Sequence, residues 1–266
     1  MLQSIKFQNA LKALLLIGLG LFLYSRIANG TLYYYIAQRF ALYTLIAIVG
    51  LIVVGLSYYS EPKGETHEPH EHDEDEHHQH AHNHEHNHEH NHSHGLTWGG
   101  VFLVALPMLL GMAVPPQPLG AAALSNRQVN VTSSGSTMPA AVRAASQKSS
   151  IDKNVLDWSQ MFKSTPDAAN KFAGEPVKVT GFVFRDERFA ADQFLVTRFV
   201  VSCCVADGNV AGVVVQWQSA VDLPTDQWVE VSGKFAPGAL AGETIPVVTA
   251  ESVTKIPVPN QPYLYP

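Results

Sequence analysis

The sequence has few charged residues, and outside one segment it has no histidine. Charged side chains make up 15% of the 266 residues, against about 25% in an average soluble protein. All 13 histidines lie between His67 and His94. The rest of the chain therefore lacks the imidazole base of a serine- or cysteine-nucleophile catalytic centre, unless that segment supplies it. It also lacks histidine for a structural zinc site.

Cysteine is almost absent as well, and the charge is unevenly distributed. The two cysteines, Cys203 and Cys204, are adjacent and cannot build a disulfide framework; they can form one strained vicinal bond or remain thiols. Residues 61–97 contain ten carboxylates and one lysine, a net charge of −9, which leaves +3 for the rest of the chain. So small a basic excess is too weak for a nucleic-acid-binding surface.

Long apolar runs occur at three places before the middle of the chain. Residues 40–59 contain no charge, and twenty residues at ~1.5 Å each cross a ~30 Å hydrocarbon core. The runs at 10–24 and 98–114 are shorter, and the latter contains Pro107. We predict a membrane region over residues 1–114 with three transmembrane helices at these positions. A cleaved signal peptide is the alternative for the first.

The basic residues beside these runs do not decide the orientation. Each side of the membrane would hold three of them, namely Lys6, Lys12 and Lys63 on one side and Arg26, Arg39 and Arg127 on the other. Because Lys6 and Lys12 flank the first run, we expect the N-terminus inside. The protein would then be a multi-pass protein of the inner (plasma) membrane, with residues 61–97 in the cytoplasm and the C-terminal domain outside.

The composition changes twice after the third run. Residues 115–149 are rich in Pro, Ala, Ser and Gly, which predicts a flexible linker. Residues 150–174 have helical spacing, with Ser150 as the expected N-cap. Alternating apolar residues then predict strands at 176–185, 193–205, 210–217, 227–235 and 245–256. We therefore predict an all-β C-terminal domain over 150–266, a small OB-like barrel preceded by a helix, with a small sandwich as the alternative.

The segment 61–97 carries a ladder of histidines at every even position from 80 to 94. Side chains at i and i+2 of an extended chain point the same way, so a folded chain can bring several imidazoles to one ion. Neutral imidazole suits zinc, copper, nickel and iron(II). We predict a loop that binds divalent metal, zinc first, with room for roughly three ions at about four ligands each. The candidate ligands are His67, His70, His72, His77, His78, His80, His82, His84, His86, His88, His90, His92 and His94.

Two other interpretations of this loop stay open. It can be a solvated low-complexity linker to which metal binds only incidentally. It can also be a pH sensor, because imidazole titrates near pH 6.5. In each case its low apolar content cannot bury a core, so we expect the loop to be disordered without a ligand.

The cysteine pair lies near the end of the predicted strand 193–205. Strand alternation puts Cys203 on the more apolar face and Cys204, with Arg198, on the more polar one. Cys203 is therefore expected to be a small buried side chain. Cys204 is the better candidate for a thiol ligand or redox group, with its pKa lowered by Arg198. With Asp207 nearby, two thiolates could also hold a soft metal such as Cu(I) or Zn(II).

Several of these segments resemble the YcgQ-type family of bacterial membrane proteins. The most specific is Arg-x₄-Cys-Cys-Val-Ala-Asp, which contains Arg198, Cys203, Cys204 and Asp207. The others are GFVFRDE (181–187), QWVEVSGKF (227–235), PNQPYLYP (259–266), the segment 107–124 and Trp158 in the helix before the barrel. The resemblance implies an accessory subunit that acts beside a multi-span YcgR-type permease. It also implies that Arg198, Cys203, Cys204 and Asp207 are signature positions of the C-terminal domain.

The leading hypothesis is an accessory subunit of a membrane permease that handles divalent metal ions through the histidine loop. The alternative is a membrane-anchored OB-type binding or interaction module, in which metal binding is incidental. A thiol oxidoreductase is less favoured, because the chain has no Cys-x-x-Cys motif. We expect no enzymatic activity. The expected partners are a multi-span permease in the same membrane and metal ions, with zinc the first candidate, and not nucleic acid.

Overall fold

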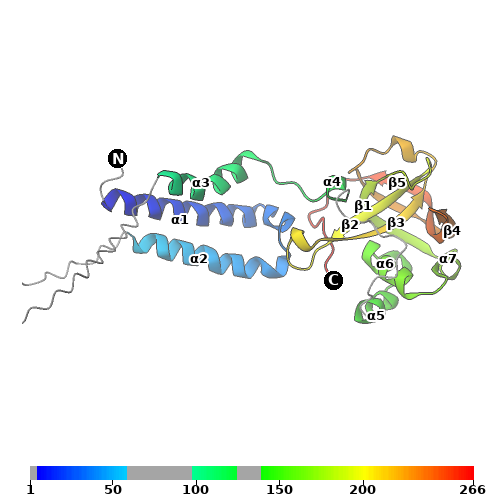
Figure 1. Cartoon of the computed structure of the whole chain (residues 1–266). Coiled ribbons are helices and arrows are strands. Elements are labelled where there is room, and N and C mark those ends of the chain that lie inside the picture. The colour runs from blue at the N-terminus through cyan, green and yellow to red at the C-terminus, as the bar shows by residue number, and fades with distance from the viewer. Residues whose placement is uncertain (1–4, 59–97, 125–138) are drawn as a thin grey trace, which may run out of the picture. The chain divides into compact units, whose positions relative to one another are not determined.

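The computed structural model describes residues 5–58, 98–124 and 139–266. The chain divides into two compact units. The first comprises Met1–Tyr24 and Leu45–Val114, and the second comprises Ser25–Thr44 and Pro115–Pro266. Figure 1 labels the elements of both units. The histidine loop lies outside the described residues, so its predicted metal sites stay predictions.

Three apolar helices account for the first unit and its margins. They are α1 (Ile5–Ala28), α2 (Ala41–Ser57) and α3 (Trp98–Ala113). Lys6–Ala28 and Gln38–Ser57 are long and apolar enough to cross a membrane. The third helix has 16 residues with Pro107 inside it, which at ~1.5 Å per residue gives about 24 Å. Two of the three predicted spans therefore have spanning length, and the third is a shorter apolar helix.

The short connection between α1 and α2 belongs to the second unit. Gly30 follows α1 with a left-handed φ of 71°, a conformation that glycine adopts without a Cβ clash. Two 3₁₀ turns follow, η1 (Thr31–Tyr34) and η2 (Gln38–Phe40). The residues between the two apolar helices are thus an ordered element of their own.

Five strands form the sheet of the second unit. They are β1 (Pro176–Phe184), β2 (Gln193–Val200), β3 (Asn209–Gln216), β4 (Trp228–Leu240) and β5 (Glu243–Lys255). The hydrogen-bonded order is β1-β2-β3-β5-β4, and β4 pairs again with β1. All pairs are antiparallel except β3 with β5, which join over three residue pairs. The predicted five-stranded β domain is confirmed, and β3–β5 is its one parallel pairing.

Apolar residues that alternate along the strands pack against one helix to form the core. The helix α6 (Val155–Ser164) begins at Asn154, whose side chain accepts from the backbone of Asp157 while the Asp157 carboxylate accepts from the backbone of Asn154. This reciprocal capping fixes the start of the helix, so the expected N-cap, Ser150, is wrong. Ser150 lies in a 3₁₀ turn and donates to Glu175 instead.

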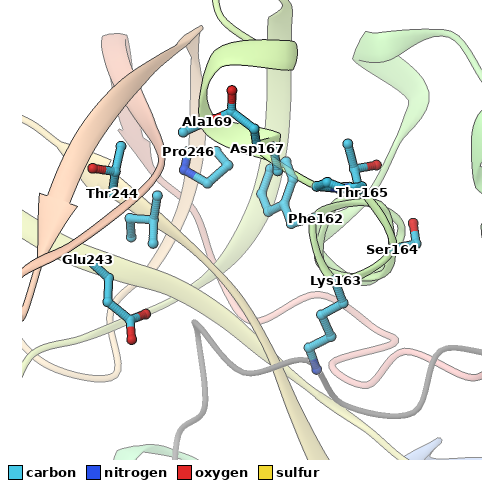
Figure 2. Close-up of a pocket in the computed structure, with 12 residues that line it drawn as sticks. Phe162, Lys163, Ser164, Thr165, Asp167, Ala169, Glu243, Thr244 and Pro246 are labelled. Carbon is cyan, nitrogen blue, oxygen red and sulfur yellow. The ribbon is translucent and has the colours of Figure 1, made fainter.

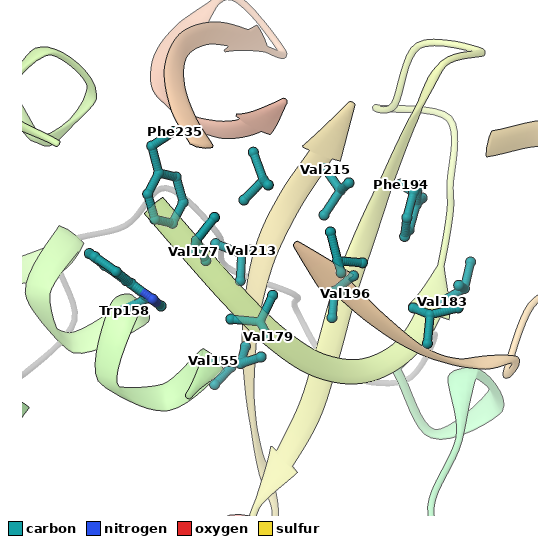
Figure 3. Packing of buried hydrophobic residues seen from close by; sticks show 14 of the residues in the cluster. Val155, Trp158, Val177, Val179, Val183, Phe194, Val196, Val213, Val215 and Phe235 are labelled. Atoms are coloured by element: carbon teal, nitrogen blue, oxygen red, sulfur yellow. The ribbon is translucent and has the colours of Figure 1, made fainter. Parts of the chain in front are cut away.

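The capped helix places Trp158 against the sheet. Its ring lies 4.7 Å from that of Phe235 and 5.7 Å from that of Phe172, measured between centroids. Figure 3 shows Trp158 and Phe235 beside the valines of β1 and β3. A second buried cluster, around Phe182, Phe199 and Trp228, lies on the other side of the strands. The core therefore extends on both faces of β2, whose residues are almost all buried.

The segment expected to be a flexible linker is structured where it is described. It contains α4 (Ala121–Leu124) and α5 (Pro139–Gln147). Leu124 and Ala145 are fully buried. The backbone N–H of Ala121 donates to the Asp226 carboxylate over 2.5 Å. These two stretches pack within the second unit, because their alanine and leucine side chains bury apolar area there.

Candidate functional site

The cysteine pair lies in a turn beyond the end of β2. The strand ends at Val200, and a 3₁₀ turn, η4, covers Val205–Asp207. The predicted strand end at residue 205 is therefore wrong. The physical reason is Asp207, whose carboxylate accepts from the backbone N–H groups of Ser202 (2.9 Å) and Cys203 (2.6 Å) and so turns the chain.

This turn brings the two thiols together. Their Sγ atoms are 3.8 Å apart, and both cysteines are free. Cys203 is exposed and Cys204 is half-buried. The expectation that Cys203 is a buried core residue is wrong, because the strand alternation on which it rested stops three residues earlier.

The electrostatics of the turn favour a protonated thiol at Cys203. The hydrogen bond of its thiol to the Asp207 carboxylate is the first cause that raises the Cys203 pKa, to about 11. The same hydrogen bond holds the pKa of Asp207 below its usual value. A neighbouring carboxylate opposes the negative thiolate, so Cys203 is a thiol at neutral pH.

Arg198 serves the C-terminal tail rather than the thiols. From β2 its guanidinium donates to the carbonyl oxygens of Gln261, Pro262 and Tyr263, with 3.1 Å to Pro262. It also lies over the Trp228 ring, 5.6 Å from the centroid. Burial lowers the Arg198 pKa to about 10. The predicted effect of Arg198 on Cys204 has no support in these contacts, which are made with the tail and with Trp228.

The tail continues as an additional partner of β2. Leu264 forms a parallel bridge with Val200, donates to Phe199 (2.8 Å) and accepts from Val201 (2.9 Å). The neighbouring side chain of Tyr263 is buried. Its hydroxyl accepts from the backbone N–H of Leu119 (2.8 Å) and donates to the carbonyl of Tyr34 (3.1 Å). One phenol thus links the residues after α3 to the connection between α1 and α2.

The same connection pairs with the cysteine turn. Ile36 forms an antiparallel bridge with Cys204, and the N–H of Ala37 donates to the carbonyl of Cys203 over 3.0 Å. The N–H of Val205 donates to the carbonyl of Tyr35 over 3.0 Å. Two backbone hydrogen bonds therefore join segments that are more than 160 residues apart.

Arg39 completes this contact, because its guanidinium donates to the carbonyl of Ser202. We call residues 34–39, 119, 198–207 and 261–264 the clamp. Its members from the signature motif are Arg198, Cys203, Cys204 and Asp207, and the structure brings all four into it. The sequence analysis missed the partners at 34–39. A polar and aromatic connection of about a dozen residues, longer than a tight turn requires, was the available signal.

A concave region lies between the β4–β5 hairpin and the turn that joins α6 to the short helix after it. It is a cavity of about 380 Å³. Figure 2 shows Lys163, Asp167 and Glu243 around it, with Phe162 and Pro246 between them. Asp167 precedes α7 (Ala168–Lys171) with a positive φ of 52°. The sequence analysis did not single out this region, since it is formed by segments about 80 residues apart.

Comparison with known proteins places the chain in a family. Residues 11–130 match the DUF1980 N-terminal domain, and residues 128–266 match the DUF1980 C-terminal domain. The chain belongs to the DUF1980 family. It is 26% identical over 122 residues to the UPF0703 protein YcgQ of Bacillus subtilis (strain 168), which covers 45% of this chain and 43% of that protein. The resemblance to the YcgQ-type family is thereby confirmed.

A second relative carries a name that describes a role. It is the "Putative two-component membrane permease complex subunit" of Streptococcus mutans serotype c, 27% identical over 115 residues, or 42% of this chain and 41% of that protein. Both alignments span less than half of the relatives' lengths. Neither name is that of an enzyme. Together with the two long apolar helices, these matches indicate that the protein is associated with a membrane.

Proposed function

We propose that the protein is an accessory subunit of a membrane permease complex, acting beside a multi-span permease in the same membrane. The observation that carries this proposal is the clamp. A β domain anchored only by a tether would leave the connection between α1 and α2 free. Here the tail and the cysteine turn bind that connection at Tyr34, Ile36 and Ala37. The β domain therefore binds the connection between the two apolar helices as part of its own unit, which supports a role for it beside the membrane rather than at the end of a free tether.

The clamp also supports a topology with three spans. The connection between α1 and α2 and the residues from Pro115 onward belong to one unit, so both lie on one side of the membrane. A chain that leaves that side through α2 must return through α3. The 16 residues of α3 suffice where the bilayer thins locally or flanking residues reach the interface. Its Pro107 is tolerated, because neighbouring groups in a membrane protein can satisfy the freed carbonyl.

This topology places the histidine loop across the membrane from the β domain. With the N-terminus inside, the loop is cytoplasmic and the β domain is outside. Reporter fusions at Asn83 and at the C-terminus test it, and we expect the two to report opposite sides. Fusions that report the same side would remove the third span from the proposal.

We further propose that the β domain is of the OB type. Its strand order, β1-β2-β3-β5-β4 with β4 returning to β1, supports this, since an OB-fold is a five-stranded, partly open Greek-key barrel. Such domains present loops and one sheet face to partners. A partner-binding domain of this type is also consistent with the alternative function, a membrane-anchored interaction module whose metal binding is incidental.

The histidine loop supplies the proposed substrate class. The carboxylates of this segment, of net charge −9, concentrate cations by their field, and its thirteen imidazoles are mostly neutral and able to bind metal at neutral pH. We propose that the loop collects divalent metal, zinc first, for the permease. Among the described residues, no three of the His, Cys, Asp or Glu side chains form a group that could hold a metal ion. The loop is thus the place where a multi-ligand zinc site is to be sought.

Co-expression with the YcgR-type permease separates the two functions. The measurements are copurification in mild detergent and zinc transport into vesicles, each with the full chain and with a variant lacking residues 67–94. A permease subunit that handles metal copurifies in both forms and loses zinc transport in the deletion. Copurification with unchanged transport favours the interaction module. No copurification in either form contradicts the proposed function.

A further inference from the structure

We propose that Cys203 and Cys204 together form a two-coordinate site for a soft monovalent metal ion such as Cu(I), distinct from the histidine loop. Adjacent residues of an extended chain point to opposite sides, and Cys204 itself has extended backbone angles (φ −151°, ψ 169°). The two Sγ atoms are nevertheless only 3.8 Å apart. Two soft ligands therefore point to one place on an accessible turn.

The backbone around the pair is held from both sides. The Asp207 carboxylate binds the N–H of Cys203, and the carbonyl of Cys203 accepts from Ala37. Cys204 is paired with Ile36, and the next N–H, that of Val205, donates to Tyr35. The ordering of the turn is thus complete before any ion arrives. Only the two thiol side chains need to adjust, which lowers the entropic cost of binding.

The number and type of ligands select the ion. Structural zinc sites use four ligands, whereas no third His, Cys, Asp or Glu among the described residues joins these two in a metal-binding group. The Asp207 carboxylate beside the pair is engaged by the backbone N–H groups of Ser202 and Cys203, which hold the turn. Thiolates select soft ions such as Cu(I). Two thiolates alone therefore favour a monovalent soft ion over a divalent one.

Binding requires no change of oxidation state. The ion displaces one proton from each thiol and forms two metal–sulfur bonds, which leaves a bis-thiolate complex with one net negative charge and two released protons. The raised pKa of Cys203 makes this release unfavourable at low pH. The apparent affinity should therefore rise with pH, by about tenfold per pH unit for each proton released.

The test is Cu(I) titration of the detergent-solubilised protein, without oxygen, against a chromophoric Cu(I) chelator. It is carried out with the variant lacking residues 67–94, so that the histidines do not compete. We expect one Cu(I) per chain, two sulfur neighbours in copper X-ray absorption, and an affinity that rises with pH. Cys203→Ser and Cys204→Ser should each lower the affinity at least tenfold, and Ser219→Ala, at an exposed serine of the same domain, should leave it unchanged.

Three results would overturn the site. One is equal Cu(I) affinity in the double variant Cys203→Ser/Cys204→Ser; another is a copper spectrum without sulfur. The third is a pair isolated as a vicinal disulfide that dithiothreitol does not open. Thermal unfolding of each variant shows whether the turn is still folded. Because the isolated subunit is used, the outcome is independent of copurification with the permease.

Discussion

Valine has opposite surroundings in the two units of this chain. On α2, Val49 and Val53 are each 60% exposed, whereas Val213 and Val215 on β3 are 1% and 0% exposed. A soluble domain hides such side chains because water penalises them, while a bilayer is itself apolar and accepts them. The comparison teaches that the hydrophobic pattern has two meanings here. In the second unit apolar residues mark the buried core of a domain, and in the first unit they mark the surface that faces lipid.

The largest expected effect is on the core of the second unit. Trp158→Ala removes a side chain that is 1% exposed and packs on Phe235 and Phe172. We expect a loss of about 3–5 kcal/mol in the free energy of unfolding, because the site cannot collapse around so large a cavity. Urea unfolding monitored by far-UV circular dichroism measures it. In the same assay Val53→Ala on α2, whose side chain is exposed, should change the free energy of unfolding little. An equal loss in both variants would contradict the difference between the two units.

A matched pair of substitutions at equally exposed valines sharpens the contrast. Val49 in the middle of α2 and Val221 in the second unit are both 60% exposed. Val49→Arg should cost about 2.5–3.5 kcal/mol of membrane insertion, because a charge at a helix centre must leave water. Val221→Arg should stay within about 0.5 kcal/mol, as surface substitutions do.

The fraction of each variant that resists carbonate extraction from membranes provides the measurement for this pair. A normal fraction for Val49→Arg would mean that α2 does not face lipid.

The parts of the fold that follow local patterns could be predicted, and those that depend on distant partners could not. Alternation placed the start of β1 at Pro176 and that of β2 at Gln193 as observed. It failed at the end of β2, where the side chain of Asp207 turns the backbone. The pairing of Ile36 with Cys204 could not be predicted in this way, because the length of the connection indicates an ordered segment but does not identify its partner. It joins a connection between apolar helices to a turn at the far end of the chain.

The same reasoning explains the signature motif. Arg198, Cys203, Cys204 and Asp207 were recognisable as a group, but their shared role in the clamp depends on carbonyls and N–H groups of other segments. A sequence specifies such backbone partners only through the complete fold. The histidine loop is the opposite case, since its predicted metal binding rests on composition alone.

A smaller effect is expected from release of the tail. Arg198→Met keeps most of the side-chain volume and removes the hydrogen bonds to Gln261, Pro262 and Tyr263. Charged hydrogen bonds contribute about 1.5–3 kcal/mol, so we expect a loss of about 2 kcal/mol and faster amide exchange at Leu264. Arg185→Met is the matched control, because Arg185 donates to loop carbonyls at Ala220 and Leu223 away from the tail. Equal amide exchange at Leu264 in both variants would show that the hydrogen bonds of Arg198 do not hold the tail in place.

The smallest expected effect concerns a rate rather than stability, and it tests the chemistry of the clamp. Asp207→Asn removes the carboxylate that raises the pKa of Cys203 to about 11, while the amide oxygen can still accept a backbone N–H. The thiol pKa should fall toward its ordinary value of about 8.5. Since the thiolate is the nucleophile, alkylation by iodoacetamide at pH 8 should become more than tenfold faster.

This comparison is made in the Cys204→Ser background, so that only Cys203 reacts. Asp222→Asn, a neutralisation in the turn η5 (Ala220–Asp222), controls for the loss of one negative charge elsewhere in the same domain. An unchanged pH profile in Asp207→Asn would show that the carboxylate does not set the state of the thiol. A shifted profile would show that the clamp contains a thiol whose pKa is set by a neighbouring carboxylate. The apolar helices contain no cysteine and cannot have this property.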